Sequence, residues 1–409
     1  MENSTLNAPS KRDIKFTIAA CYFGAFTQAA VAGLPPLFYS LYNERLGLPL
    51  QLIALFPTLF FGLQIVIDGL FSGVVAKIGY KRTAMLADAF STLGLILLGF
   101  TPLFPSPTAV IFISTVLCAI GSGIIEITAS PLIEALPNDN KSSAMSFLHS
   151  FYCWGYLFVI LLTTGFFALF GKEKWFVLPF VFALIPIIGG TLYIPIKRIV
   201  TLEEQGSVKF SSFGKNSLFV LLFLMMVCAG AGEQVVSQWA SFFVEKGLGI
   251  SKTLGDLLGT SAFALCMALA RTFFGAKTHK TDICKSLLIS VIILAAAYLL
   301  TALSPVPALS VIGVGLCGLS VGILWPCTLS LAGESGLNGG TLMFALLALA
   351  GDIGCTLGPT LAGEISAATS INVGLLAGVI FPAINVILLI VYKSAHKKKI
   401  TENVIKNAL

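Results

Sequence analysis

Twelve long apolar stretches, separated by short polar or proline-containing breaks, constrain the fold of this chain more than any other feature. A helix that crosses the hydrocarbon core of a bilayer needs about 20 apolar residues. Only 11% of the 409 residues are charged, whereas a soluble domain averages about 25%. The sequence therefore predicts an all-α membrane protein with twelve transmembrane helices. The expected spans are 16–42, 51–76, 83–101, 108–132, 143–169, 175–195, 217–244, 255–275, 284–303, 308–332, 341–366 and 371–392.

The distribution of Lys and Arg predicts the orientation in the membrane. If both termini lie on one side, 20 of the 25 basic residues, Arg271 among them, fall on that side. The other side then has only Arg45, Lys172, Lys174, Lys246 and Lys252. Because cytoplasmic loops are rich in Lys and Arg, both termini are expected in the cytoplasm and the protein in the cytoplasmic membrane. The net charge of +6 follows from this asymmetry, so no nucleic-acid partner is implied.

The longest polar stretch between expected helices divides six spans from six. We predict an N-terminal six-helix bundle over 1–196, a cytoplasmic linker over 197–216 and a C-terminal six-helix bundle over 217–409. The polar start of the chain has no small-residue cleavage site of a signal peptide, so the first helix is expected to stay.

A weak internal repeat relates the two halves. CAIGSGIIE, which begins at Cys118, resembles CGLSVGILW, which begins at Cys317. Two further pairs follow the same order, GAFTQ with GAGEQ and MSFLHSFYCWG with MFALLALAGDIG. The repeat sets Glu126 opposite Trp325, Gln28 opposite Gln234, and Trp154 opposite Asp352. Three such matches favour a duplicated bundle with pseudo-symmetric halves.

Two parallel six-helix halves resemble the major facilitator superfamily, whose substrate site lies near the midplane between the halves. The loop segment SGVVAKIGYKRT resembles the cytoplasmic signature of that superfamily. Aligned on Gly79, the bases Lys81 and Arg82 fit the signature, while Ser72 and Ala76 replace its opening glycine and its acid. The resemblance implies a gating role for Gly79, Lys81 and Arg82. Basic anchors at a helix end are the alternative.

Within the fourth span, GSGIIEITASPLIEALP resembles the fucose permease type of sugar:proton symporter. Glu126 stands where that family has a glutamate, and Ser130 replaces the asparagine before Pro131. The acid that the family carries in its first helix has no counterpart here. The resemblance implies a small polar solute, such as a sugar or a sugar-like metabolite, that enters with a proton.

Ionisable residues inside the spans are the candidates for proton coupling. A charge at the bilayer centre costs about 2.5–3.5 kcal/mol on insertion scales, so a retained one usually serves a cavity or a proton path. The candidates are Glu126, His149, Glu233 and Asp352. For each, a hydrogen-bonded packing role is the alternative. Asp88, near the cytoplasmic end of its span, is expected to be a hydrated interfacial charge.

Polar and aromatic residues inside the spans are the candidates for substrate contact. Residues four apart share a helix face, which pairs Glu233 with Ser237 and Gln234 with Gln238. Packing and helix-to-helix hydrogen bonds are the alternative for every one of these side chains. The candidate substrate-binding residues are Gln28, Gln64, Trp154, Gln234, Ser237, Gln238, Trp239 and Trp325.

These features predict a secondary active transporter that works by alternating access, with protons as the coupling ion and sodium as the alternative ion. A proton-coupled antiporter that exports drugs or metabolites is the rival function. The sequence has no GxxxxGK[ST] loop, HExxH or GxSxG motif, so we expect neither an enzyme nor an ATP-driven pump. The nine cysteines form no CxxC pair, and no metal or cofactor is expected. The other expected partners are the lipid bilayer and the transported solute, and the protein is expected to be a monomer.

Overall fold

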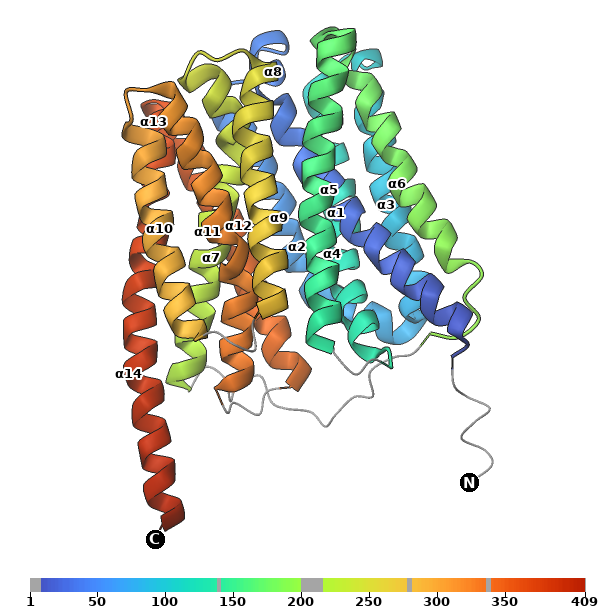
Figure 1. The fold of residues 1–409 in the computed structure, drawn as a ribbon. Coiled ribbons are helices and arrows are strands. Elements are labelled where there is room, and N and C mark those ends of the chain that lie inside the picture. Colours follow the sequence, from blue (N-terminus) through green and yellow to red (C-terminus); the bar gives the residue numbers. More distant parts are fainter. Residues whose placement is uncertain (1–8, 138–140, 200–215, 278–281, 336–339, 409) are drawn as a thin grey trace. The chain divides into compact units, whose positions relative to one another are not determined.

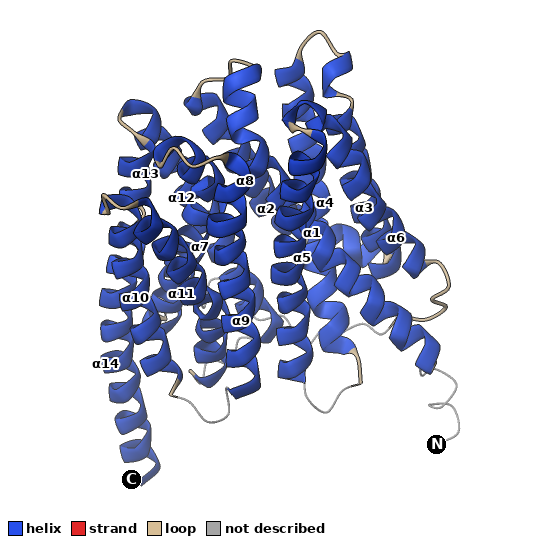
Figure 2. Cartoon of the chain, turned by 45° about the horizontal axis from the view of Figure 1, so that its top comes forward, coloured by secondary structure: helices blue, strands red, loops and turns tan. Residues whose placement is uncertain are grey.

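The computed structural model describes residues 9–137, 141–199, 216–277, 282–335 and 340–408, and this part of the chain is helical with short connections (Figure 2). The α-helices are α1 (Lys11–Arg45), α2 (Leu50–Ile78), α3 (Tyr80–Gly99), α4 (Pro107–Ala135), α5 (Lys141–Phe170), α6 (Leu178–Tyr193), α7 (Ser217–Phe242), α8 (Lys252–Gly255), α9 (Ser261–Lys277), α10 (Ile283–Leu303), α11 (Pro307–Glu334), α12 (Gly340–Ala368), α13 (Ile371–Ala377) and α14 (Ile380–Ala408).

The described residues contain 12 helical segments long and apolar enough to cross a membrane, which confirms the predicted all-α membrane fold. Most helix ends differ from the predicted bounds by a few residues, as in α1, which begins at Lys11 rather than at residue 16, and two further differences concern the eighth and the last span. The eighth span begins at Lys252, because α8 continues into α9 through a π-helical turn, Asp256–Thr260. The last helix, α14, continues past the predicted end at 392 to Ala408.

The chain forms two compact units, Met1–Glu203 and Glu204–Leu409, coloured blue to green and yellow to red in Figure 1. Most of the predicted linker 197–216 lies outside the described residues. The division into two bundles joined by a cytoplasmic linker therefore stays a prediction.

The internal repeat has a structural counterpart inside each unit. A Cβ built on Gly123 of α4 would lie 3.0 Å from Ile67 of α2, so these two helices pack with almost no gap. At the equivalent position in the repeat, a Cβ on Gly322 of α11 would lie 2.8 Å from the carbonyl oxygen of Met267 of α9. Matched glycines thus permit the same close helix approach in both units.

Local sequence signals explain where several helices begin. Ser10 caps α1 by accepting a hydrogen bond from the Asp13 amide at 3.0 Å, and the Asp13 carboxylate accepts one from the Ser10 amide at 3.2 Å. This reciprocal pair is a capping box, which satisfies amides that have no partner at a helix start. Pro107 occupies the first turn of α4, where its missing amide hydrogen costs nothing.

Candidate functional site

Ser122 of α4 is the meeting point of three helices in the N-terminal unit. Gln28 of α1 donates its side-chain amide to the Ser122 carbonyl oxygen at 3.1 Å. Gln64 of α2 donates to the Ser122 hydroxyl at 2.8 Å. Gln64 and Ser122 are buried, and among the described residues Gln64 Oε1 accepts no hydrogen bond. The cluster therefore keeps one unused acceptor inside the unit.

Glu126 lies one helical turn after Ser122, so it extends from the same face of α4 as that cluster. Its side chain is half-buried, unlike those of the fully buried neighbours Ile124 and Ile125. A carboxyl group and two side-chain amides thus lie on one side of α4, contributed by α1, α2 and α4. This arrangement suits a polar solute and a proton acceptor in the same place.

Two further predicted residues lie on α5, which packs against α1 and α4. His149 is half-buried, and Trp154 is 41% exposed at the surface of the unit. Because Trp154 is this accessible, its ring is available to a partner outside the unit. The proton relay between His149 and Glu126 stays a prediction.

In the C-terminal unit, Glu233 of α7 faces a cation with which the sequence analysis did not pair it. Arg271 of α9 lies with Nη2 3.4 Å from Glu233 Oε2, and its Nε donates to the Gly322 carbonyl oxygen at 3.2 Å. Both side chains are at most 10% exposed. The sequence analysis counted Arg271 only as a charge of the cytoplasmic side, whereas the structure shows its guanidinium enclosed by α7, α9 and α11. Ser237, predicted on the Glu233 face, is buried one turn later.

The two buried glutamines of α7 lie as the helical spacing predicted. Gln238 Nε2 donates to Gln234 Oε1 at 3.2 Å, which confirms that the two share a face. Trp239, the next residue, is fully enclosed, and its indole nitrogen donates to the Pro359 carbonyl oxygen of α12 at 3.0 Å. Since its only donor is satisfied by the protein, Trp239 holds α12 against α7 in this conformation. Substrate contact by these residues stays a prediction.

Asp352 of α12 is buried where α12 crosses α7 at very short range. A Cβ on Gly354 would lie 2.0 Å from the Val227 carbonyl oxygen, so only glycine fits at this crossing. The glycines around Asp352 therefore allow α12 and α7 to approach closely. Trp325 of α11 is half-buried, with its ring against Gly351, the residue before Asp352.

The α7–α12 crossing gives a direct prediction. We expect Gly354→Ala to destabilise the protein by about 1–3 kcal/mol or more, because overpacking of a rigid interface costs that much. The matched control is Gly333→Ala on α11, where an added Cβ meets nothing within 4 Å; a helical Gly→Ala change there stabilises by about 0.5–1 kcal/mol. Thermal unfolding of both variants in detergent checks this. Equal midpoints would contradict the account.

The predicted gating residues lie at the junction of α2 and α3. Gly79 has φ 82°, a conformation that favours glycine, and it separates the two helices. Lys81 donates to the carbonyl oxygens of Ile194 at 3.0 Å and Ile196 at 2.7 Å, while Arg82 is exposed. A cation on carbonyl groups just past the end of α6 is a favourable C-terminal cap. The contacts of Lys81 therefore favour the anchoring role over gating.

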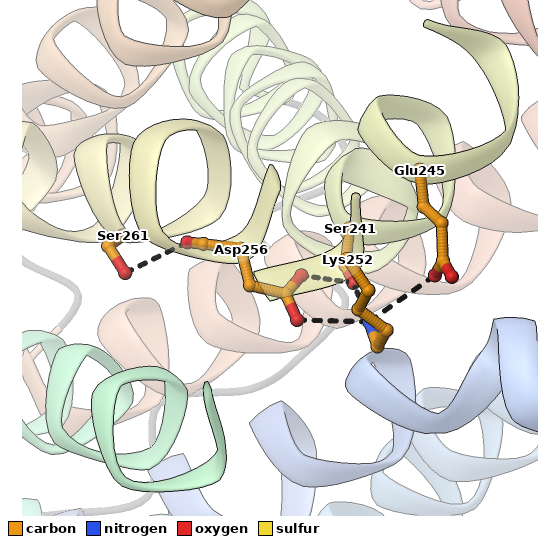
Figure 3. Close-up of polar contacts among 5 residues, drawn as sticks. All are labelled: Ser241, Glu245, Lys252, Asp256 and Ser261. Atoms are coloured by element: carbon orange, nitrogen blue, oxygen red, sulfur yellow. Dashed lines mark hydrogen bonds and ion pairs between the residues drawn. The ribbon is translucent and has the colours of Figure 1, made fainter. Parts of the chain in front are cut away.

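One cluster of charges was missed by the sequence analysis. Figure 3 shows Lys252 between Asp256 and Glu245, with Nζ 3.0 Å and 3.8 Å from their carboxylate oxygens. Lys252 also donates to the Ser241 hydroxyl at 2.6 Å, and this hydroxyl donates to Asp256 Oδ1 at 2.5 Å. The sequence analysis placed Lys252 just outside the eighth span, which was wrong, because the span begins at this residue and its side chain is 1% exposed. The i,i+4 spacing of Lys252 and Asp256 is the signal that could have revealed the pair.

The two acids of this cluster lie in π-helical turns, Phe243–Gly247 and Asp256–Thr260. Such turns are rare and often mark functional positions. Ser261 satisfies the Asp256 carbonyl oxygen with its hydroxyl at 2.9 Å. The cluster therefore fixes the end of α7 to the start of the α8–α9 helix.

Ser241 is the centre of that cluster, and its removal should be costly. We expect Ser241→Ala to destabilise the protein by about 1.5–3 kcal/mol, the usual range for hydrogen bonds to charged groups. Ser251→Ala, at an exposed helix start where the hydroxyl makes no capping bond, should change stability by less than about 0.5 kcal/mol. Denaturation midpoints of the two variants provide the measurement. A loss no larger for Ser241→Ala than for the control would show that the cluster is not stabilising.

Within the described residues, no group of three or more His, Cys, Asp or Glu side chains is arranged to hold a metal ion. The polar sites described above are built from side-chain amides, hydroxyl groups and carboxyl groups, together with the Arg271 guanidinium and the Lys252 ammonium group.

Comparisons with solved structures agree on the fold. A bacterial homologue of the human lysosomal transporter Spinster, in an inward-facing and occupied conformation, has a TM-score of 0.72 at 14% identity, with 94% of this chain and 98% of that chain covered. The nucleoside transporter NupG, in a mutant form, has a TM-score of 0.70 at 13% identity, with 94% and 99% covered. No curated protein sequence matches this chain significantly.

The sequence model of the Major Facilitator Superfamily matches residues 18–336 and again residues 222–407. The two matches together span almost all of the transmembrane helices of both units. With this match, the chain belongs to the major facilitator superfamily.

Proposed function

We propose that this protein is a secondary active transporter that moves a small polar solute inward together with protons, with Glu126 as the coupling group. The observation that carries the proposal is the grouping on α4, where Glu126 follows the Ser122 cluster by one turn. A side-chain amide can donate a hydrogen bond to a hydroxyl group through its nitrogen or accept one through its oxygen. A carboxyl group beside them can be neutralised when a proton arrives.

Proton coupling follows from the cost of burying charge. An ionised carboxyl group is expensive in a dry membrane interior, and its neutral form much less so. A proton on Glu126 therefore lowers the free energy of states that enclose this residue relative to states that leave it wet. Because the proton binds the enclosed and the wet states with different affinity, it shifts the equilibrium between them.

The C-terminal unit offers two further coupling groups, Glu233 and Asp352. Glu233 is compensated by Arg271, so its proton affinity depends on whether that cation stays close. Asp352 is buried in α12, directly after Gly351, which lies against the Trp325 ring. We propose that one of the two acts with Glu126. Sodium could replace the proton only if these groups gathered additional oxygen ligands.

Sugars and nucleosides are the solute classes that fit best. Both carry several hydroxyl groups that suit Gln28 and Gln64, and a nucleoside also has a flat base that an aromatic ring such as Trp154 could stack on. NupG, a nucleoside transporter, has a similar fold. Sequence resemblance to the fucose permease type at Glu126 and Pro131 supports a sugar.

Uptake into proteoliposomes tests the proposal. Radiolabelled monosaccharides, nucleosides and organic acids are offered with the interior alkaline, and again without a pH gradient. We expect one sugar or nucleoside class to accumulate only with the gradient. Accumulation that is the same without the gradient, or that is driven by sodium alone, would contradict proton symport. Export driven by an acidic exterior would favour the antiporter.

A further inference from the structure

Asp88 of α3 is a buried carboxyl group that the proposed transport cycle does not use. The sequence predicted a hydrated charge near the membrane interface, and this was wrong. Asp88 is 3% exposed, and its Oδ1 has no hydrogen-bond partner among the described residues. A carboxyl group in this position needs a specific explanation.

Two consecutive glycines of α6 make the room for this carboxyl group. A Cβ on Gly189 would lie 3.2 Å from Asp88 Oδ1 and 3.4 Å from Oδ2, and a Cβ on Gly190 would lie 3.4 Å from Asp88 Cβ. Phe23 of α1 lies on the same side, with its Cβ 3.4 Å from the position of a Gly189 Cβ. The carboxyl group thus sits in the contact between α3 and α6, which we call the α3–α6 seam.

Within the described part of the chain, no Lys, Arg or His interacts with Asp88 to compensate a charge on it. The titratable groups that interact with it from α1 and α6 are Cys21 and Tyr193, whose sulfur and hydroxyl oxygen lie 4.0 Å apart. Both are uncharged at neutral pH. α4 packs on α3 through Gly94, where it contributes the Cys118 thiol.

Lys81 of α3 extends to the end of α6. Its ammonium group is bound to the Ile194 and Ile196 carbonyl oxygens and not to Asp88. Seven residues separate Lys81 from Asp88, which is about 10 Å along a helix. Lys81 therefore closes the seam at its end, and Asp88 lies deeper within it.

We propose that Asp88 is a proton-binding site, separate from Glu126, Glu233 and Asp352, that holds the α3–α6 seam closed when occupied. An ionised carboxyl group enclosed without a counter-charge is strongly disfavoured, so the closed seam contains the neutral acid. When the seam opens and water enters, the proton leaves and the carboxylate is hydrated. Closure is therefore linked to proton uptake. This proposal does not depend on the identity of the transported solute.

The linkage has a definite sign. Because the closed seam binds one proton that the open seam releases, closure is favoured at low pH and weakens as pH rises. Each pH unit changes the ratio of open to closed seam by about tenfold while the open form stays ionised. The asparagine of Asp88→Asn has the shape of the neutral acid and no proton to lose. The α3–α6 seam of this variant should stay closed at every pH tested.

Infrared spectroscopy of the full-length protein in lipid tests the protonation directly. The wild-type minus Asp88→Asn difference spectrum at neutral pH should contain the carbonyl-stretch band of one protonated carboxyl group. Asp13→Asn is the matched control, since Asp13 accepts hydrogen bonds from the Lys197 and Ser10 amides and should be ionised. A carboxylate band instead of a protonated band at Asp88 would overturn the proposal.

Hydrogen–deuterium exchange of α6 tests the closure. After correction for intrinsic exchange, opening of residues 178–193 should rise about tenfold per pH unit in the wild type and stay flat in Asp88→Asn. The same pH dependence in both proteins would overturn the proposal.

If Asp88→Asn folds poorly, another pair of variants tests the proposal. Gly189→Ala should increase opening of α6, since its Cβ presses on the carboxyl oxygens. The same change in an Asp88→Ala background should have a clearly smaller effect. Equal effects in both backgrounds would mean that Asp88 does not fill the seam.

Discussion

Glu126→Gln should abolish proton-driven accumulation while the protein still exchanges its solute. Glutamine has nearly the shape of a neutral glutamic acid but binds no proton, so the conformational cycle loses its link to the pH gradient. With one proton per solute, each unit of pH gradient supports about tenfold accumulation in the wild type. The variant should reach a ratio of about 1, whatever the gradient. Accumulation and solute exchange are both measured in proteoliposomes.

Glu364→Gln is the matched control for this change. It makes the same Glu-to-Gln change at an exposed position of α12. We expect wild-type accumulation from this variant. If Glu126→Gln retained gradient-driven accumulation, Glu126 would not be the coupling group and the grouping around Ser122 would be structural only.

The buried pair Glu233–Arg271 gives the largest expected effect on stability. Arg271→Met leaves the Glu233 carboxylate enclosed without its cation, and Glu233→Leu leaves the guanidinium enclosed with the Gly322 carbonyl oxygen. Removal of one partner of a buried ion pair costs about 3–5 kcal/mol, whereas replacement of both by apolar residues is often neutral. We therefore expect both single variants to be strongly destabilised and the double variant to recover to within about 1 kcal/mol of the wild type.

Thermal unfolding of the four proteins forms a double-mutant cycle for this pair. Lys285→Met, at an exposed position of α10, controls for loss of a positive charge as such and should leave stability nearly unchanged. Losses that simply add in the double variant would contradict a direct interaction between Glu233 and Arg271.

The sequence predicted the helices well because the bilayer leaves few choices. A run of about 20 apolar residues has to satisfy its backbone internally, so span and helix coincide. Helix-face arguments also held where the partners belong to one helix, as for Gln234 and Gln238. The matched glycines Gly123 and Gly322 were visible as a repeat before their packing was known.

Contacts between polar residues on different helices could not be predicted from the sequence. Arg271 and Lys252 were counted only as charges of one membrane side or the other, because they lie near the ends of apolar runs, where a snorkelling side chain and a buried one look alike. Asp88 was misplaced for the same reason. The space that encloses it comes from Gly189 and Gly190, about 100 residues later in the chain. The π-helical turns around Glu245 and Asp256 follow no periodic pattern that a sequence displays.

The central claim is that solute and protons move together in the same direction. A pH-sensitive dye sealed inside proteoliposomes tests it most directly, when solute is added outside with no gradient imposed. The account predicts that the interior acidifies in the wild type, and that Glu126→Gln gives no pH change although solute still enters. Alkalinisation of the interior, or solute entry without any pH change in the wild type, would contradict it.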